Sequence, residues 1–378
     1  MQQSPVLTTP VPFLDLRPSH GPLKDSLVEE FAELVETGAF TNGPQVSLFE
    51  EAFAAYCGTL HCVGTGSGHD ALRLALLAAG LEPGEEVVVP AQTFVATLEA
   101  VTQAGGRPLV VDVSEADYGL DAKAVEAVVG PRTRFLMPVH LYGQMADMRA
   151  LAAVAESHGL GIVEDACQAH GATRDGLRAG AAGLAGAFSF YPGKNLGAFG
   201  DAGALVMDDE ELARRMRALR EHGQSAKYVH DLEGYTSRLD TVQALVLLRK
   251  LALLDGWNEQ RRAAAANYDA GLAGIGDLRL PFVAPGSEPV WHLYVVRTGE
   301  PKELAAFLRE RGIGTGRHYP YPPHLSPAYA RLGHRPGSFP VAEALAAECL
   351  SLPLFPGMRE EQLAAVVAAI GEYFDRGR

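Results

Sequence analysis

The sequence predicts an α/β fold, with a mainly parallel sheet covered by helices in a large domain, followed by a smaller C-terminal α+β domain. Two observations favour this class. Short apolar runs alternate with helical patterns over the first two-thirds of the chain. Past about Leu239 this alternation stops and two long helical segments begin. Because ligands of such sheets bind at the carboxyl ends of the strands, we expect the site at that edge.

The first part of the chain contains four short apolar runs that we interpret as strands. They cover residues 87–90, 108–113, 135–139 and 162–165. Helical patterns lie between or before them, at about residues 70–79, 95–104, 122–129 and 148–157. Pro83-Gly84 and Gly105-Gly106 are turn signals between these segments. This alternation predicts parallel strands joined by covering helices.

The last part of the chain has a different pattern. Helical patterns cover residues 239–254 and 257–272, and residues 276–289 contain three prolines and two glycines, which is typical of a linker. A strand at 291–297, a helix at 302–311, a second strand near 314–318 and two closing helices follow. We therefore expect a large domain over residues 1–250, with an N-terminal arm of about residues 1–20, and a small domain over residues 251–378.

The composition is that of an ordinary globular enzyme, with 378 residues of which 47% are hydrophobic and 21% charged. A net charge of −14 disfavours nucleic acid and anionic membranes as partners. The four cysteines are few and isolated, which indicates free thiols in a reducing compartment rather than a zinc site. Residues 1–12 lack a signal-peptide pattern and no apolar run reaches membrane length, so we expect a cytoplasmic protein.

Lys194 is the most informative single residue. It lies in a Pro-Gly turn that follows an apolar run at residues 187–191, and small residues surround it. A lysine amine that is desolvated and deprotonated can act as a Schiff-base nucleophile. Taken alone, this segment favours the simpler interpretation, a surface lysine in a Pro-Gly turn.

A second segment, residues 161–171, supports the catalytic interpretation of Lys194. There an apolar strand ends in Asp165 and runs into a loop of small residues. A carboxylate at a strand end and a lysine on a later turn are what pyridoxal phosphate needs, because the carboxylate keeps the pyridine nitrogen protonated. Asp165 could otherwise be a helix cap or a loop carboxylate. Glu164 should face the opposite way, since adjacent strand residues alternate.

The two segments resemble those of the DegT/DnrJ/StrS family of pyridoxal-phosphate-dependent sugar aminotransferases. The likeness continues in PAQTFVAT at 90–97, PVHLYG at 138–143, GYTSRLD at 234–240, HYP at 318–320 and LPLFPG at 352–357. These motifs span nearly the whole chain in family order. The resemblance implies a fold-type-I transferase that forms a homodimer with shared active sites.

The resemblance also implies a cofactor site. Lys194 would form the Schiff base and move the substrate proton, and Asp165 would pair with the pyridine nitrogen. Gln168 matches the family position near the ring hydroxyl, Ser189 matches the serine that binds phosphate, and Phe94 matches the aromatic residue stacked on the ring. Each could otherwise be a loop or core residue.

Phosphate binding is predicted at a glycine-rich loop that opens a helix, residues 64–72. Backbone donors at Gly68 and His69 would contact the phosphate, although the family usually has threonine or another residue at position 69. The loop lacks the G-x-G-x-x-G spacing of dinucleotide sites. In the family a second loop, here residues 234–238, reaches the phosphate of the neighbouring subunit. Thr236 stands there in place of the usual asparagine.

Substrate contacts are implied at five further residues. Arg238 could bind the carboxylate of the amino donor or be structural, and His318 and Tyr319 fall where the family's small domain borders the substrate. Tyr191 and Tyr235 are expected to contact the sugar or its nucleotide.

We therefore expect a pyridoxal-phosphate-dependent aminotransferase that moves an amino group from L-glutamate, leaving 2-oxoglutarate, to a nucleotide-linked keto sugar. Asn195 after the lysine and the segment 318–325 resemble members that act at C3, which implies a dTDP-3-keto-6-deoxyhexose and a 3-amino sugar. The alternatives are a 4-keto sugar aminotransferase, a cyclitol aminotransferase and a non-catalytic cofactor-binding regulator.

Overall fold

A seven-stranded sheet forms the centre of the computed structural model, which describes residues 10–376. Its strand order is β1-β9-β8-β5-β4-β2-β3, and only β9 runs antiparallel to its neighbours. The strands are β1 (His61–Thr65), β2 (Glu86–Pro90), β3 (Arg107–Val111), β4 (Thr133–Leu136), β5 (Gly161–Asp165), β8 (Ala185–Ser189) and β9 (Gly203–Met207). The predicted α/β class with a mainly parallel sheet is confirmed.

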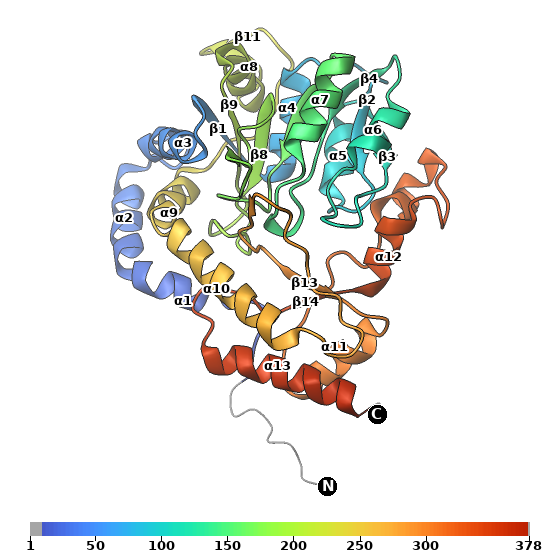
Figure 1. The fold of residues 1–378 in the computed structure, drawn as a ribbon. Helices are drawn as coiled ribbons and strands as arrows, with labels where there is room; N and C mark the ends of the chain where they lie inside the picture. Colours follow the sequence, from blue (N-terminus) through green and yellow to red (C-terminus); the bar gives the residue numbers. More distant parts are fainter. Residues whose placement is uncertain (1–9, 377–378) are drawn as a thin grey trace.

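Helices cover both faces of this sheet (Figure 1). Strand β2 illustrates why, because its consecutive valines point to opposite sides. Val88 packs in a cluster with Phe49 and Leu151, whereas Val87 and Val89 pack in a second cluster with residues of α4 and α5. The covering helices are α3 (Pro44–Cys57), α4 (Gly68–Ala78), α5 (Ala96–Gln103), α6 (Ala122–Val128), α7 (Met148–His158), α8 (Glu210–Arg220) and α9 (Thr241–Leu251).

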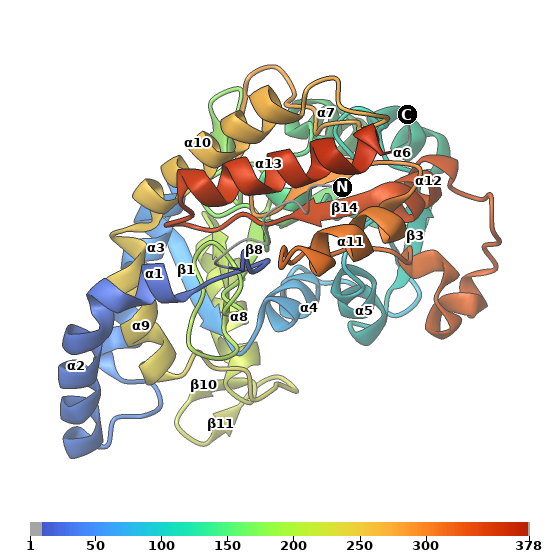
Figure 2. The same ribbon diagram turned by 90° about the horizontal axis from the view of Figure 1, so that it is seen from below.

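The C-terminal part builds a separate hydrophobic cluster around two antiparallel strands, β13 (Tyr294–Arg297) and β14 (Cys349–Leu352). Three helices pack on this ribbon: α10 (Leu254–Leu272), α11 (Pro301–Glu310) and α13 (Glu360–Asp375). Figures 1 and 2 show them together on one side of the large sheet. The helix expected at 302–311 and the strand expected at 291–297 are therefore present.

The second strand expected near residues 314–318 is wrong. In that segment only an isolated bridge joins Gly316 to Ser351, and β14 is the strand that pairs with β13. The physical reason is close packing against the N-terminal segment: a Cβ on Gly314 would lie 2.7 Å from the Phe13 nitrogen. Arg317 also turns aside to donate to the carbonyl of Ala346.

The remaining elements are short or peripheral. They are α1 (Arg17–His20), α2 (Lys24–Thr37), α12 (Pro340–Glu348), β6 (Thr173–Arg174), β7 (Leu177–Arg178), β10 (Gln224–Ala226), β11 (Val229–His230), β12 (Ser287–Glu288) and the 3-10 turns η1 (Gly21–Leu23), η2 (Leu141–Gly143), η3 (Pro323–Leu325) and η4 (Pro327–Leu332). None of the described helices is long and apolar enough to cross a membrane.

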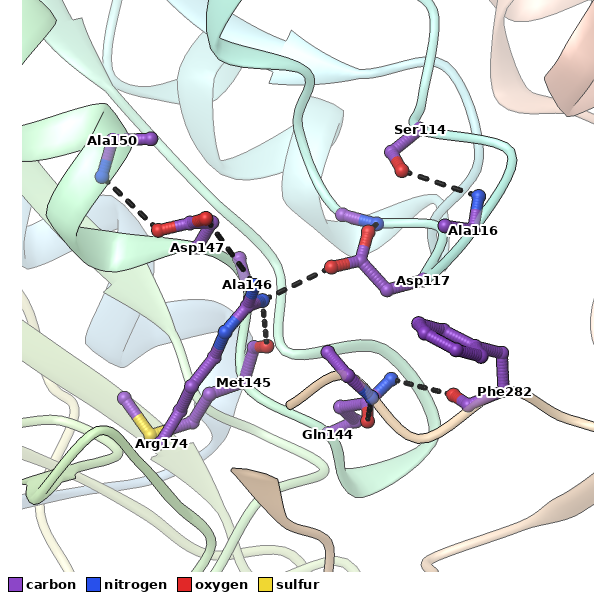
Figure 3. Close-up of polar contacts among 12 residues, drawn as sticks. Ser114, Ala116, Asp117, Gln144, Met145, Ala146, Asp147, Ala150, Arg174 and Phe282 are labelled. Carbon is purple, nitrogen blue, oxygen red and sulfur yellow. Dashed lines mark hydrogen bonds and ion pairs between the residues drawn. The ribbon is translucent and has the colours of Figure 1, made fainter. Parts of the chain in front are cut away.

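The proline-rich segment 276–289 is fastened to loops of the large sheet (Figure 3). Gln144 donates to the carbonyl of Phe282 at 3.1 Å and accepts from the Ala284 amide at 2.9 Å. Close by, Arg174 pairs with Asp117 at 3.0 Å and with Asp147 at 3.2 Å. These contacts fix the position at which the chain enters β13, and therefore the position of the C-terminal part relative to the large sheet.

Candidate active site

A cavity of about 420 Å³ opens where β5 and β8 end. Its walls come from the large sheet, from the N-terminal segment at Phe13 and Leu14, and from the C-terminal part. Of the predicted site residues, all those outside the 234–240 loop line it: Gly68, His69, Phe94, Asp165, Gln168, Ser189, Tyr191, Lys194, His318 and Tyr319. The fold thus brings together residues that are far apart in the sequence.

Lys194 stands in a tight turn directly after β8. Its amide donates to the carbonyl of Tyr191 at 2.8 Å, and Gly197 is needed to close the loop because a Cβ there would lie 2.3 Å from the Pro192 oxygen. Burial lowers the pKa of the Lys194 ammonium, although Cys167 and Asp165 nearby act in the opposite direction. A lowered pKa raises the fraction of free amine, so this lysine suits nucleophilic chemistry.

Asp165 ends β5 with its carboxylate facing the cavity, and it is only 6% exposed. Thr97 donates to Oδ2 at 2.8 Å, and the Cys167 amide donates to Oδ1 at 3.2 Å. Thr93 in turn bonds Thr97 at 2.7 Å. The segment after Asp165 is a loop and not a helix, so the carboxylate is no helix cap. Two donors hold it in one orientation toward the cavity.

Glu164 points to the other side of the sheet, as strand alternation requires. Its carboxylate accepts from the amides of Gly180, Ala182 and Gly183 at 2.7–2.9 Å and pairs with His140 at 2.8 Å. This fully buried network fixes the loop under β8. The contacts of Glu164 are therefore structural, whereas its neighbour Asp165 faces the cavity.

The start of α4 forms the end of the cavity that suits an anion. Ser67 caps the helix by accepting from the Asp70 amide at 3.1 Å, and Gly68 packs so closely that a Cβ would lie 2.6 Å from the Ser189 Cβ. His69 Nε2 is buried and has no hydrogen-bond partner among the described residues. Helix N-termini carry partial positive charge and free N–H groups, so these residues fit a phosphate group.

Aromatic and amide side chains also line the cavity. Phe94 is half exposed and tilts against Tyr319, with 5.5 Å between ring centroids. Gln168 accepts from the Tyr142 amide at 2.8 Å and donates to the Tyr319 hydroxyl at 3.3 Å. His318 bonds Ser351 at 2.8 Å. Burial, and then the charge of Lys194, lower the pKa of His318 to about 4, so this ring is neutral near pH 7.

Tyr235, Thr236 and Arg238 do not line the cavity of their own chain. Arg238 pairs with Glu221 at 2.8 Å, and Thr236 lies 3.2 Å from the nearer ring nitrogen of His222. The 234–240 loop is nonetheless fixed near α4, since Ser237, which lies between Thr236 and Arg238, donates to the Asp70 carboxylate at 2.7 Å. The resemblance implies that Thr236 reaches the phosphate of the neighbouring subunit and that Tyr235 and Arg238 contact the substrate, and within one chain all three lie outside the cavity.

The residues at or beside the cavity that were not assigned a role from the sequence include Thr97, Cys167, Arg261 and His292. Arg261 is almost fully buried and donates to the carbonyls of Trp291 and Leu354 at 3.2 and 3.1 Å. Burial lowers its pKa to about 10. Thr97 is the last residue of the PAQTFVAT motif at 90–97. Arg261 and His292 carried no local signal, because the long chain path through the C-terminal part brings them to the cavity.

The arrangement defines a class of protein. A lysine of lowered pKa and a carboxylate at a strand end line the cavity, together with a helix N-terminus whose His69 Nε2 has no partner within residues 10–376. This donor set fits pyridoxal phosphate, whose pyridine nitrogen, aldehyde and phosphate need these three groups. The fold and the site are those of a pyridoxal-phosphate enzyme.

Comparison with known proteins identifies the family. The model of the DegT/DnrJ/EryC1/StrS aminotransferase family matches residues 23–371. The chain is 50% identical to the dTDP-3-amino-3,4,6-trideoxy-alpha-D-glucose transaminase of Streptomyces venezuelae, over 98% of this chain and 97% of the relative. It is 47% identical to the erythromycin biosynthesis sensory transduction protein EryC1 of Saccharopolyspora erythraea, over 95% and 98%.

Solved structures agree. The crystal structure of S. venezuelae DesV in complex with ketimine intermediate superposes with a TM-score of 0.95 at 50% identity, covering 98% of this chain and 100% of that chain. The chain belongs to the DegT/DnrJ/EryC1/StrS aminotransferase family. It is an aminotransferase with pyridoxal 5′-phosphate as its cofactor, and the expectations of family, enzyme class and cofactor are confirmed.

Proposed function

We propose that this enzyme transfers the amino group of L-glutamate to a dTDP-linked 3-keto-6-deoxyhexose and releases a 3-amino sugar and 2-oxoglutarate. The observation that carries the proposal is the pair Lys194 and Asp165 on one cavity, in a chain half identical to a transaminase named for a 3-amino sugar. Asn195 after the lysine, where C4 enzymes more often have histidine, supports the C3 position.

The residues divide the work as follows. Bound pyridoxal phosphate supplies the electron sink that stabilises charge on the carbon next to the transferred nitrogen. Asp165 holds the proton on the pyridine nitrogen, and Lys194 Nζ takes the proton from the α-carbon of the donor and later returns one to the sugar carbon. The start of α4 and Ser189 hold the phosphate, while Phe94 and Gln168 hold the ring.

The substrate enters past Tyr191, which is 59% exposed at the cavity wall. His318 and Tyr319 also line the cavity. Two basic side chains, Lys194 and Arg261, and two carboxylates, Asp165 and Asp201, line this cavity. In a chain of net charge −14, Arg261 is the group there that would attract an anionic substrate such as glutamate.

We also propose a homodimer with shared active sites. Thr236 and Arg238 lie outside the cavity of their own chain, which supports a role in the cavity of a second copy. Helix α2 has apolar residues on two sides: Leu27 and Leu34 are buried, whereas Val28, Phe31 and Val35 are 47–61% exposed. An exposed apolar stripe on a helix is typical of a subunit interface.

Two further proposals concern organisation and location. The separate cluster around β13 and β14 supports a division into residues 1–250 and 251–378. All four cysteines are free thiols, which supports a reducing, cytoplasmic location.

The test is a panel of nucleotide-linked keto sugars with glutamate. The 3-keto sugar is generated in place by a coupled isomerising enzyme, because such sugars rearrange, and the product amine is located by NMR. We expect the 3-keto-6-deoxyhexose to be converted and its 4-keto isomer to react poorly. An amine at C4 would contradict the C3 assignment, and turnover of an amino cyclitol alone would contradict the sugar substrate.

A further inference from the structure

A chain of side-chain amides runs from the core to the cavity wall beside Lys194. Asn258 donates through Nδ2 to the carbonyl of His170 at 2.9 Å. Asn195 donates through Nδ2 to Asn258 Oδ1 at 2.9 Å and to the carbonyl of Val290 at 2.8 Å. His292 Nδ1 lies 3.3 Å from Asn195 Oδ1. The chain therefore ends at an imidazole on the cavity.

The two backbone carbonyls at the start of this chain fix the direction of every bond in it. A carbonyl can only accept, so the nitrogen of each amide must face the carbonyls of His170 and Val290. Asn195 Oδ1 consequently faces His292, and an amide oxygen can only accept. His292 must carry its hydrogen on Nδ1, which leaves Nε2 with a free lone pair when the ring is neutral.

Burial keeps the ring neutral. Burial first, and then the charges of Lys194 and Arg261, hold the pKa of His292 well below its ordinary value. His292 lines the cavity, and its Nε2 has no hydrogen-bond partner among the described residues. Asn195 is 5% exposed and does not line the cavity. Asn195, the residue next to Lys194, can therefore act on a substrate through His292.

We propose that His292 Nε2 accepts a hydrogen bond from the sugar hydroxyl next to the reacting carbon, and that Asn195 is the positioning residue that fixes the tautomer. This inference rests on the proposed sugar substrate. Among the products of that class, the 3-amino-3,4,6-trideoxyhexose in the name of the S. venezuelae relative keeps one free ring hydroxyl, at C2, because C1 bears the nucleotide. That hydroxyl is a donor adjacent to C3, and a neutral Nε2 is the matching acceptor. The pair would orient C3 toward the Lys194 amine.

The first test measures the tautomer in the cofactor-loaded protein without turnover. Long-range proton–nitrogen NMR of ¹⁵N-histidine-labelled enzyme reports which ring nitrogen bears hydrogen, and the His292→Asn variant assigns the signal. We expect Nδ1 to be protonated and Nε2 free from pH 6 to pH 8. In Asn195→Leu the signal should move toward the other tautomer. A protonated Nε2 in the wild-type enzyme would overturn the inference.

The second test uses the reverse reaction, because amino sugars do not undergo the elimination that threatens 3-keto sugars. Conversion of the dTDP-linked 3-amino-3,4,6-trideoxyhexose with 2-oxoglutarate is compared with that of its 2-deoxy analogue. We expect wild-type kcat/KM to fall at least about tenfold without the hydroxyl, the size of one lost hydrogen bond. His292→Leu should lose that preference, and His292→Gln, which keeps an acceptor, should retain part of it.

A matched control is His158→Gln, a histidine on α7 that pairs with Glu126 away from the cavity. It should keep the wild-type preference. Equal use of both sugars by the wild-type enzyme, or an unchanged preference in His292→Leu, would overturn the inference and leave the aminotransferase intact. If neither amino sugar reacts but another nucleotide sugar does, the proposed substrate fails, while the NMR result still decides the tautomer.

Discussion

Thr97 holds the Asp165 carboxylate in position. Separate variants of the two residues test the catalytic role of the carboxylate and the positioning role of the hydroxyl. Thr97 donates to Oδ2 at 2.8 Å, whereas Thr102 on the same helix donates to the backbone carbonyls of Leu98 and Glu99. We expect Asp165→Asn to fold but to lose most turnover, because an amide cannot hold the pyridine proton. Thr97→Val should lower cofactor affinity by about 1 kcal/mol, the net worth of one hydrogen bond.

Absorbance titration with pyridoxal phosphate and steady-state rates measure both effects. Thr102→Val is the control, since it removes the same hydroxyl from α5 without touching Asp165. Near-normal turnover in Asp165→Asn would contradict the assigned role of the carboxylate.

Some site residues can be predicted from the sequence because their signals are local. Lys194 and Asp165 each follow a short apolar strand, and parallel strands bring such positions to one edge. His292 has no such signal. It reaches the cavity through the segment before β13, and its tautomer depends on Asn195, which lies 97 positions away in the chain.

At the scale of elements, helix α9 supports the catalytic loop. Lys250 on α9 is 3% exposed and donates to the carbonyl of Gly197, three residues after Lys194. It also lies 3.1 Å from His20 Nε2. Burial lowers the pKa of Lys250 from 10.5 to about 8. The loop that carries Lys194 is therefore held by a buried cation whose charge changes in the mildly alkaline range.

We expect the difference in the free energy of unfolding between the wild-type protein and the Lys250→Met variant to depend on pH. Because the folded pKa is below the unfolded value, the unfolded state binds more protons between pH 8 and 10.5, and wild-type stability rises relative to the variant in that window. The gain should be roughly 3 kcal/mol in total. Urea titrations of both proteins from pH 7 to 10.5 measure it, and a constant difference would contradict the lowered pKa.

The strands and helices were predicted correctly where a clear apolar run or helical pattern marks them in the sequence. The strands expected at 87–90 and 162–165 correspond to β2 and β5. Strands β1 and β9, of five residues each, and helices α2, α3 and α8 were not predicted, and α8 is rich in charged residues. The strand expected at 314–318 was wrong because tertiary packing of Gly314 against Phe13 overrides its local preference.

At the scale of the whole molecule, the proposed shared site predicts complementation. Lys194→Ala and Arg238→Glu should each be inactive alone. If the loop acts across the interface, a mixed dimer has one site with both defects and one with neither, so equal mixing should restore about a quarter of the wild-type activity.

Subunit exchange under mild denaturant followed by an activity assay measures this restoration. Absence of recovery in proven mixed dimers would indicate that the loop acts within its own chain. A monomer by light scattering would contradict the proposed homodimer.

The domain division at residue 250 stays a prediction, since α10 packs against both parts, with Leu254 in one cluster and Tyr268 in another.

The central claim is that Lys194 is the residue that binds the cofactor covalently. The most direct measurement is borohydride reduction of the cofactor-loaded enzyme, followed by proteolysis and mass spectrometry. We predict a pyridoxyl phosphate mass on the peptide that contains Lys194 and none in Lys194→Ala. The same mass on another lysine, such as the buried Lys250, or no labelled peptide from an enzyme that binds the cofactor, would contradict the account.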